Sequence, residues 1–334
     1  MISKKTLKIA GLLFFLLVFA CFVIFITDFS GGSEPDWGVT FSRSYALDLQ
    51  LDWKEAYLAI LNDLNVSHIR LSAYWDEIEK EKDVYDFSDL DWQIQEASDR
   101  EVKIVLAIGR RLPRWPECHD PDWVKHLTTQ QANSEILSLL ESVINRYRDN
   151  EYIVAWQVEN EPLFAWFGFC PPPDKKFLKQ EIDIVKSIDP TRPVVITDSG
   201  ELSNWQNAAS LADVFGTTLY RIVWNKKLGF WDYWFVPPAF YRYKADITQF
   251  LHPNLREVIV TEMQMEPWTL DRRMTELTKA EQEQSFDLKR FRDNIKYVTK
   301  TGFREVYLWG VEYWYWLKER GDSLMWEEAK KLWN

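Results

Sequence analysis

The sequence predicts an α/β protein, a (β/α)8 barrel that is preceded by a single N-terminal transmembrane helix. Beyond residue 36, eight short β-rich segments alternate with amphipathic helical stretches, the pattern of a parallel sheet covered by helices. The length of 334 residues fits one barrel of roughly 250 residues together with an anchor and long loops. The expected organisation is a basic N-terminus (1–8), a membrane anchor (9–27), a linker (28–35) and a barrel domain (36–334).

The first element is an uncharged apolar run of 19 residues, from Ile9 to Thr27, which is about the length that crosses a bilayer core as a helix. Lys4, Lys5 and Lys8 precede it, so the positive-inside rule predicts a cytoplasmic N-terminus and an extracytoplasmic domain. A cleaved signal peptide is the alternative. The run exceeds the usual apolar core of a signal peptide, and no small-residue cleavage site follows it, so we expect an uncleaved single-pass anchor.

Eight strands are expected, at residues 37–42, 68–75, 103–109, 152–160, 193–199, 214–220, 257–263 and 305–310. They are nearly continuous in apolar residues, as required where both faces of a sheet are buried, and eight units is the number that closes a barrel. A doubly wound open sheet is the alternative prediction. No G-x-G-x-x-G or P-loop motif follows any strand, so a nucleotide site in such a sheet has no support.

Helices are expected in the gaps, at about residues 53–64, 90–100, 133–147, 177–188 and 279–299. The last two are the clearest, because their apolar residues recur at helical spacing. The gap between the sixth and seventh strands contains an unusually aromatic segment, from Trp224 to Tyr243. This segment could cap a cleft or touch the membrane surface.

Composition argues against several functional classes. The net charge of −11 opposes binding to phosphate backbones, so we expect no nucleic-acid partner. The four His residues lack the spacing of a metal site, and we expect neither a metal nor a cofactor. The chain carries 18 Trp, whose flat rings can stack on sugars. Most of these rings are expected to fill the core, so only those near strand ends are candidates for binding.

Glutamates stand at the ends of two predicted strands, where the chemistry of such barrels collects. The fourth strand ends in VENEP, which contains Asn160 and Glu161, and the seventh ends in TEM, which contains Glu262. These strands lie across the ring from each other, so Glu161 and Glu262 can face each other over a pocket. Two carboxyl groups about 5 to 5.5 Å apart cleave glycosides with retention, one protonating the leaving oxygen while the other attacks the anomeric carbon.

These motifs resemble clan A glycoside hydrolases, retaining TIM-barrel enzymes with an Asn-Glu pair ending strand four and a nucleophilic Glu ending strand seven. The resemblance covers the chain from Trp37 onward; it is greatest to glycoside hydrolase family 5, which is cellulase-like, and extends to families 39 and 42. It implies that Glu161 is the acid/base, Asn160 binds the substrate 2-hydroxyl and Glu262 is the nucleophile. Tyr220 stands where many family 5 members have a His-x-Tyr arrangement, so the substrate is not carried over.

Other residues fit the same resemblance as substrate contacts. Arg70 resembles the clan's arginine near the nucleophile, Tyr220 its aromatic or His partner, and Trp309 the platform under the sugar. Their structural interpretations are a buried ion pair, a filler of the barrel rim and a core ring. Trp75 and His119 are added because they lie at or just after strand ends. Further candidates at such positions are Arg110, Arg111, Trp115, Trp166, Trp205, Trp224 and Trp314.

Two other glutamates compete with this pair. Glu159 is expected to point away from the pocket, or into the barrel where it could pair with Arg70. Glu266 lies beyond the seventh strand and suits a subsite contact, so Glu262 is the preferred nucleophile.

Cysteine usage is consistent with a domain outside the membrane. Cys21 lies in the apolar run and is interpreted as a membrane-buried thiol. Cys118 and Cys170 lie in loops after consecutive strands, so a disulfide between them is a hypothesis, with two free thiols as the alternative.

The sequence therefore predicts a membrane-anchored, extracytoplasmic glycosidase that hydrolyses O-glycosyl bonds of a poly- or oligosaccharide by a retaining mechanism. Candidate substrates are β-glucans, mannans and β-galactosides. A transglycosylase that remodels envelope glycans would use the same two glutamates. A non-catalytic carbohydrate-binding barrel is the alternative from another class, and the presence of Asn160, Glu161 and Glu262 argues against it.

Overall fold

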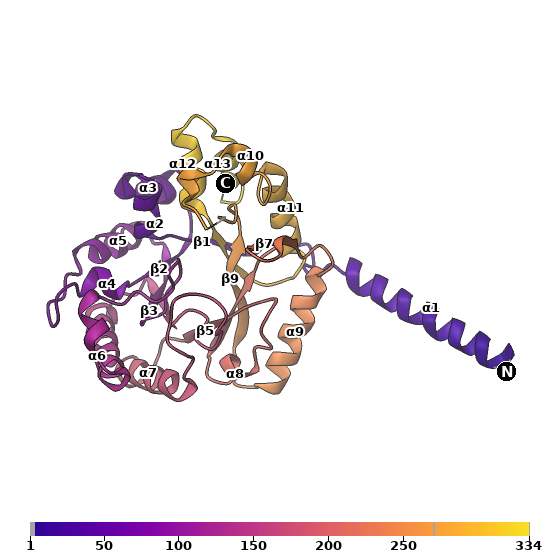
Figure 1. Cartoon of the computed structure of the whole chain (residues 1–334), viewed down its shortest axis with the longest axis horizontal. Coiled ribbons are helices and arrows are strands. Elements are labelled where there is room, and N and C mark those ends of the chain that lie inside the picture. Colours follow the sequence, from indigo (N-terminus) through magenta and orange to yellow (C-terminus); the bar gives the residue numbers. More distant parts are fainter. Residues whose placement is uncertain (1–3, 270, 334) are drawn as a thin grey trace.

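The eight β-rich segments close into one barrel of parallel strands in the computed structural model, which describes residues 4–269 and 271–333. The strands are β1 (Asp36–Thr40), β2 (His68–Ser72), β3 (Lys103–Ile108), β4 (Ile153–Val158), β5 (Val194–Asp198), β6 (Val214–Leu219), β9 (Glu257–Gln264) and β10 (Glu305–Trp309). They follow one another around the ring in chain order, and β10 pairs with β1. This ring confirms the predicted barrel and excludes the open sheet (Figure 1).

Helices cover the outside of the ring (Figure 1). The longer ones are α3 (Trp53–Ala59), which continues as the π-helical turn η1 (Ile60–Leu64), α5 (Ser88–Ser98), α6 (Thr129–Tyr147), α7 (Lys175–Ile188), α9 (Pro238–Leu251), α11 (Leu288–Thr299) and α12 (Val311–Glu319). The shorter ones are α2 (Arg43–Asp48), α4 (Trp75–Ile78), η2 (Asp122–His126), α8 (Gln206–Ala209), η3 (Met274–Glu276), α10 (Lys279–Gln282) and α13 (Leu324–Lys330). The predicted helices at 53–64, 90–100, 133–147 and 177–188 are confirmed.

Several of these helices begin at a side-chain cap that the local sequence supplies. Thr128 and Gln131 form a capping box at the start of α6. The carboxylates of Asp52 and Asp174 accept hydrogen bonds from first-turn amides of α3 and α7. Each such cap contributes about 1 kcal/mol, so these boundaries follow from short-range interactions.

The prediction of one helix over residues 279–299 is wrong in its continuity. The structure divides this stretch into α10 and α11, with residues 283–287 between them. Ser285 and Phe286 are buried there, and the Ser285 hydroxyl accepts a hydrogen bond from the backbone of Trp268. Asp287 then has an extended backbone and caps α11 by accepting from the Arg290 amide. A tertiary contact and a new cap therefore interrupt the helical periodicity.

The aromatic segment between the sixth and seventh barrel strands is folded rather than a loop. Two antiparallel strands, β7 (Ile222–Asn225) and β8 (Gly229–Asp232), form a hairpin, and α9 begins six residues after it. The hairpin lies over α11, because Arg290 pairs with Asp232 and the Tyr297 hydroxyl donates to the Val236 carbonyl.

The interior of the barrel changes character along its axis. A small apolar cluster occupies the inside near the amino ends of the strands and consists of Val105, Ala155, Val195, Val214, Ile259 and Tyr307. Two residues further along three of these strands, the buried side chains are Gln157, Thr197 and Thr261. Since side chains in a strand alternate with a period of two, these polar residues form the next inward layer. Polar chemistry is thus confined to the carboxyl end of the barrel.

Helix α1 (Lys4–Ile26) projects away from the barrel beside α9 (Figure 1). Within the described part of the chain, it contains the single helix long and apolar enough to cross a membrane, Lys8–Ile26. The linker after it is fastened to the domain. The Phe29 amide donates to the Lys300 carbonyl, and the Phe29 ring packs edge-on against Tyr243 of α9.

Candidate active site

A bulge in β9 decides where Glu262 points. Thr217 of β6 pairs with Val260, but the next residue, Thr218, pairs with Glu262, so β9 holds one extra residue at Thr261. Val260 and Met263 both pack in the core outside the barrel. The extra residue therefore leaves both Thr261 and Glu262 on the inner side, which a regular strand could not do.

The Glu262 carboxylate is held at both oxygens. Arg70, fully buried on β2, donates to Oε1 at 2.9 Å, and the Tyr220 hydroxyl donates to Oε2 at 2.9 Å. The same guanidinium donates to Gln157 Oε1 at 2.7 Å and to Asn160 Oδ1 at 2.8 Å. Arg70 thereby joins β2, β4 and β9 beneath the site, and its charge is paired as a buried charge must be.

The end of β4 brings Asn160 and Glu161 into the same region. The backbone of both Glu159 and Glu161 is in the left-handed region, with φ of 60° and 45°, which is uncommon for residues other than glycine. The Glu161 amide donates to Thr197 Oγ1 at 2.7 Å, and the Asn160 amide donates to the Arg111 carbonyl. These contacts stabilise the strained turn, and backbone strain that is stabilised in this way is typical of functional sites.

Glu161 is buried and surrounded by other carboxylates. Burial is the largest cause that raises its pKa well above the usual range, and the neighbouring carboxyl groups of Glu262, Glu117 and Asp198 raise it further. The Thr218 hydroxyl lies 3.4 Å from Glu161 Oε1. The raised pKa favours the protonated form of Glu161, whereas Glu262 forms an ion pair with the Arg70 guanidinium.

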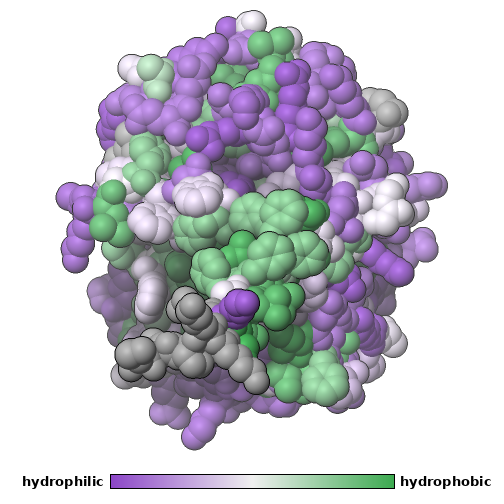
Figure 2. All heavy atoms as spheres, turned by 90° about the vertical axis from the view of Figure 1, so that its right-hand side faces the viewer, coloured by the Kyte–Doolittle hydropathy of each residue, from purple (hydrophilic) through white to green (hydrophobic). Residues whose placement is uncertain are grey.

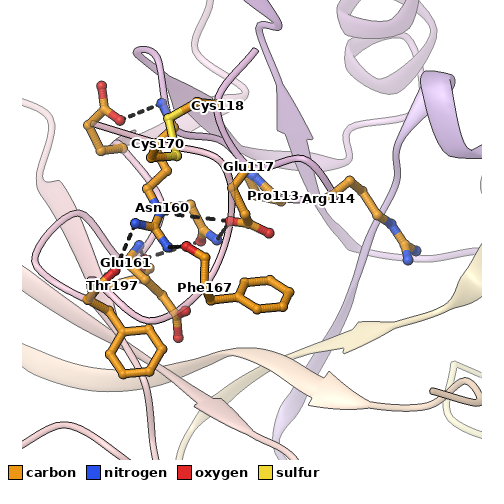
Figure 3. A network of polar contacts seen from close by, with 12 residues as sticks. Pro113, Arg114, Glu117, Cys118, Asn160, Glu161, Phe167, Cys170 and Thr197 are labelled. Atoms are coloured by element: carbon orange, nitrogen blue, oxygen red, sulfur yellow. Dashed lines mark hydrogen bonds and ion pairs between the residues drawn. A yellow bond between two sulfur atoms is a disulfide. The ribbon is translucent and has the colours of Figure 1, made fainter. Parts of the chain in front are cut away.

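Glu117 completes the site and was not predicted from the sequence. It lies in the loop after β3, next to Cys118, and accepts a hydrogen bond from Asn160 Nδ2 at 3.1 Å (Figure 3). Burial, followed by the charge of Glu262, raises its pKa to about 8. A glutamate in a loop is not marked by any periodic pattern, so the sequence does not single out Glu117. Gln157 was also not predicted, but a polar side chain within an apolar strand is a signal that could have identified it, since a buried polar group needs a hydrogen-bond partner.

Trp309 lies in a second polar group at the edge of the site. The Arg114 guanidinium lies 3.9 Å from the ring centre of Trp309 and 3.7 Å from that of Tyr45. Arg114 also pairs with Glu266 and, at 3.0 Å, with Glu312. In Figure 3 the Arg114 side chain points away from Glu161. Part of the predicted sugar platform is thus covered by a stacked cation.

Glu159 does not pair with Arg70, contrary to one of the two expectations for it. Its carboxylate oxygens accept hydrogen bonds from the backbone amides of Arg110 at 2.7 Å and Arg111 at 2.5 Å. It packs against Gly109, where any side chain would collide, because an added Cβ would lie 2.3 Å from Glu159 Oε1. Glu159 therefore points away from Glu262 and holds the start of the loop after β3.

Trp75 and His119 are not brought to the two glutamates. Trp75 is fully buried in the core, where its indole donates to Glu79 and its ring packs against Trp123. His119 is buried beside Tyr74 and contacts the Arg114 carbonyl. Both occupy helix or loop positions just after strand ends, where the chain turns back onto the outer layer. We therefore leave them out of the proposed site.

The remaining candidates separate into core and surface. Trp205 and Trp314 are fully buried, whereas Trp115 and Trp166 are exposed. Aromatic rings lead outward from the site: Tyr220 contacts Trp268, Trp268 contacts Phe167, and Phe167 contacts Trp115. Arg111 donates to the carbonyls of Phe164 and Phe167 and so supports the loop after β4.

Cys118 and Cys170 form a disulfide, as the hypothesis proposed (Figure 3). The bond joins the loop after β3, which carries Glu117, to the loop after β4. Among the described residues, no group of three or more His, Cys, Asp or Glu side chains is placed to hold a metal ion.

Comparison of the sequence with known proteins finds no matching family model. The chain is 27% identical over 184 residues to the β-galactosidase BgaA of Clostridium cellulovorans, which covers 49% of this chain and 27% of that protein. The chain thus spans about a quarter of the length of the curated relatives that it matches.

Solved structures of similar fold cover more of the chain. A cold-adapted β-galactosidase from Rahnella sp. R3 aligns with a TM-score of 0.55 and 11% identity, over 92% of this chain and 56% of that one. A family 10 endo-β-1,4-xylanase from Gloeophyllum trabeum aligns with a TM-score of 0.53 and 15% identity, over 85% of this chain and 87% of that one. At these identities the likeness shows a shared fold.

Proposed function

We propose that this chain is a retaining β-glycosidase in which Glu161 is the acid/base and Glu262 the nucleophile. The observation that carries the proposal is the contrast between the two carboxyl groups. Glu262 accepts hydrogen bonds from Arg70 and Tyr220, whereas burial, and after it the charge of Glu262, raises the pKa of Glu161. Two carboxyl groups in environments that separate their protonation states are what an acid and a nucleophile need.

In the first step, Glu262 Oε attacks the anomeric carbon and the bond from that carbon to the leaving oxygen breaks. Glu161 transfers its proton to that oxygen, so the leaving group departs as a neutral alcohol and Glu161 becomes a carboxylate. In the second step, Glu161 takes a proton from water, the water oxygen bonds to the anomeric carbon, and the glycosyl-ester bond to Glu262 breaks. Two inversions give net retention.

The same electrostatics let Glu161 change roles between the steps. The charge of Glu262 is one of the causes that raise the pKa of Glu161. Once Glu262 is esterified, that negative charge is gone, so the pKa of Glu161 falls and it becomes able to accept a proton from water. Arg70 and Tyr220 serve as positioning residues for Glu262, and Arg70 also donates a hydrogen bond to Asn160, the residue before Glu161.

Terminal β-galactosides are the substrate class we propose first, because the relatives in sequence are named β-galactosidases. β-1,4-Xylan is the second choice, because the alignment with the family 10 endo-β-1,4-xylanase covers 87% of that enzyme's chain. The exposed rings of Trp115 and Trp166 are suited to stacking on sugars beyond the bond that is cleaved. Assignment to family 5 within the clan stays a prediction.

The domain is further proposed to act outside a membrane that α1 crosses once. Support comes from the apolar Lys8–Ile26 helix and from the disulfide, which persists in oxidising compartments. The lysines at positions 4, 5 and 8 favour a cytoplasmic N-terminus.

The test is hydrolysis of aryl β-galactosides and aryl β-xylosides by the full chain in detergent, beside Glu161→Ala and Glu262→Ala. Azide should restore turnover of activated substrates by both variants, giving the β-glycosyl azide with Glu161→Ala and the α-anomer with Glu262→Ala. Glu266→Ala is the matched control, because Glu266 is the rival nucleophile, and azide should produce no α-azide from it. Unchanged activity in Glu161→Ala and Glu262→Ala would refute the site, and transfer to an added sugar in place of hydrolysis would identify a transglycosylase.

A further inference from the structure

The outer surface of α9 is apolar, unlike that of α7, another helix on the outside of the barrel. Its exposed positions are Phe240, Tyr243, Asp246, Ile247, Phe250 and Leu251, and five of these six are apolar or aromatic. On α7 the exposed positions are Lys175, Lys176, Lys179, Gln180, Asp183 and Ser187. A barrel helix that faces water is polar on that side, as α7 is. The outer side of α9 therefore has the composition of a surface that meets something other than water.

The β7–β8 hairpin and the segment after it extend this surface. Leu228, Trp231, Trp234 and Phe235 are exposed, with Trp234 at 70%, and the rings of Trp231 and Trp234 both contact Phe235. We call the nine residues together the aromatic face: Leu228, Trp231, Trp234, Phe235, Phe240, Tyr243, Ile247, Phe250 and Leu251. Figure 2 views the molecule from this side, with α1 pointing toward the viewer, apolar side chains gathered at the centre of the view and hydrophilic ones above them.

The aromatic face lies where α1 leaves the domain. The Phe29 ring contacts Tyr243 of the face, and the Phe29 amide is bonded to Lys300. Gly302 packs directly on the Phe29 carbonyl, since an added Cβ would lie 2.3 Å from that oxygen. Only Thr27 and Asp28 lie between Ile26, the last residue of α1, and Phe29, so three Cα–Cα steps join them. Fully extended, they span at most about 11 Å.

We propose that the aromatic face rests in the headgroup region of the same bilayer that α1 crosses. This inference rests on the proposed membrane anchor. A short, fastened linker keeps the face close to the membrane surface, and Trp and Tyr favour that interface because their rings are apolar with one polar end. Lys226 and Lys227, exposed at the hairpin tip, suit anionic headgroups.

The contact would orient the enzyme. In a barrel of this type, helices run along the outside roughly antiparallel to the strands. Laying α9 on the membrane therefore places the barrel axis near the membrane plane. The mouth with Glu161 and Glu262 then opens sideways, toward glycans that lie along the surface rather than toward the bulk solvent.

The test uses the full chain, with position 21 changed to Ser, in vesicles of phosphatidylethanolamine and phosphatidylglycerol. Single cysteines at Trp234, Ile247 or Phe250 carry a fluorophore, and lipids spin-labelled high on the acyl chain act as quenchers. Leu17→Cys in α1, with a deep quencher, reports the span. Val84→Cys is the matched control, exposed between α4 and α5 on the side away from α1 (Figure 1). Circular dichroism checks that each variant is folded.

We expect the quenchers to remove most of the fluorescence at positions 17, 234, 247 and 250. The fluorescence at position 84 should not change. Quenching at 17 alone would keep the anchor and overturn the membrane contact of the face. A blue shift at 234 and 250 without lipid quenching would also overturn it, since a second copy or another protein would then cover the face. Quenching of the face but not of position 17 would retain the lipid contact and remove the span.

Discussion

At the residue scale, the site is a shared network rather than two isolated glutamates. Arg70 donates to Gln157, Asn160 and Glu262, so the two strands that carry the glutamates are linked through one buried cation. Removing one partner of a buried pair leaves an uncompensated charge, which costs about 3 to 5 kcal/mol. A variant of Arg70 could therefore lose activity because the chain no longer folds rather than because the reaction is impaired. Substitutions that remove a single hydrogen bond test the roles of the site residues more directly.

Tyr220→Phe is such a change, because it removes only the hydroxyl that donates to Glu262 Oε2. A hydrogen bond to a charged group is worth about 1.5 kcal/mol or more, so kcat should fall by at least about tenfold. KM should change little if the hydroxyl orients the nucleophile rather than binding the sugar. Steady-state kinetics on an aryl β-galactoside give both values.

The control for Tyr220→Phe is Tyr74→Phe, which changes another buried tyrosine, whose hydroxyl donates to the Pro113 carbonyl and is hydrogen-bonded to the Ser42 hydroxyl. It should lower the melting temperature without lowering kcat. Equal kcat in Tyr220→Phe and the wild type would contradict a positioning role for Tyr220.

Glu117 should make stability depend on pH. Its pKa rises from the usual 4.5 to about 8 in the folded chain, so between these values the folded state holds a proton that the unfolded state has lost. The free energy of unfolding contributed by this group is fully present below pH 4.5 and is lost as pH rises through about 8. The free energy of unfolding of the wild type should therefore decrease between pH 5 and 8, and in Glu117→Gln this decrease should be smaller by a few kcal/mol.

Urea unfolding at several pH values measures this effect. Glu151→Gln, at an exposed position, is the control and should leave the slope unchanged. If Glu117→Gln keeps the slope of the wild type, Glu117 is ionised in the fold and the site holds one more negative charge than we infer.

At the scale of elements, the loops after β3 and β4 act as one unit. The disulfide joins them, Arg111 binds the carbonyls of Phe164 and Phe167, and Asn160 donates to Glu117 across the gap. On the other side of the barrel, the bulge in β9 turns Glu262 inward. Together they bring glutamates from separate elements into one mouth.

Breaking the disulfide should loosen that unit. Its partners are 52 residues apart, and the chain-entropy account of cross-links gives about 4 kcal/mol for such a loop. The double variant Cys118→Ser, Cys170→Ser should melt at a lower temperature. Its kcat should also fall, because Glu117 and Asn160 would be held less firmly in the site. Calorimetry and kinetics before and after addition of a reductant make the comparison. A reductant effect that persists in the double variant would point to a different cause.

At the scale of the whole molecule, α1 and the aromatic face define one side, and the barrel mouth defines another. The predicted single-pass anchor has a direct test. Expressed full length, the chain should stay in the membrane pellet after carbonate extraction, and its mass should include residues 1–27. A carbonate-soluble protein that begins after the apolar run would identify a signal peptide instead.

Much of the architecture could be predicted, because it depends on short-range patterns. Apolar runs of strand length separated by helical periodicity indicate a barrel whatever the details of its packing. Asn160, Glu161, Glu262, Arg70 and Tyr220 could be named because the carboxyl ends of parallel strands must meet at one mouth. Trp75 and His119 were named by the same rule, but the structure buries both, because a residue past the end of a strand can turn into the core instead of toward the mouth.

What the sequence alone determined is therefore the barrel, the apolar N-terminal helix and the identity of the two strand-end glutamates, all of which follow from periodicity and order along the chain. Only the tertiary structure decided that a β9 bulge turns Glu262 inward, that Glu117 joins the site, that Arg114 covers Trp309 and that α10 and α11 are separate. These features depend on contacts between residues far apart in the chain. Their energies exist only once the barrel has closed, so no local pattern encodes them.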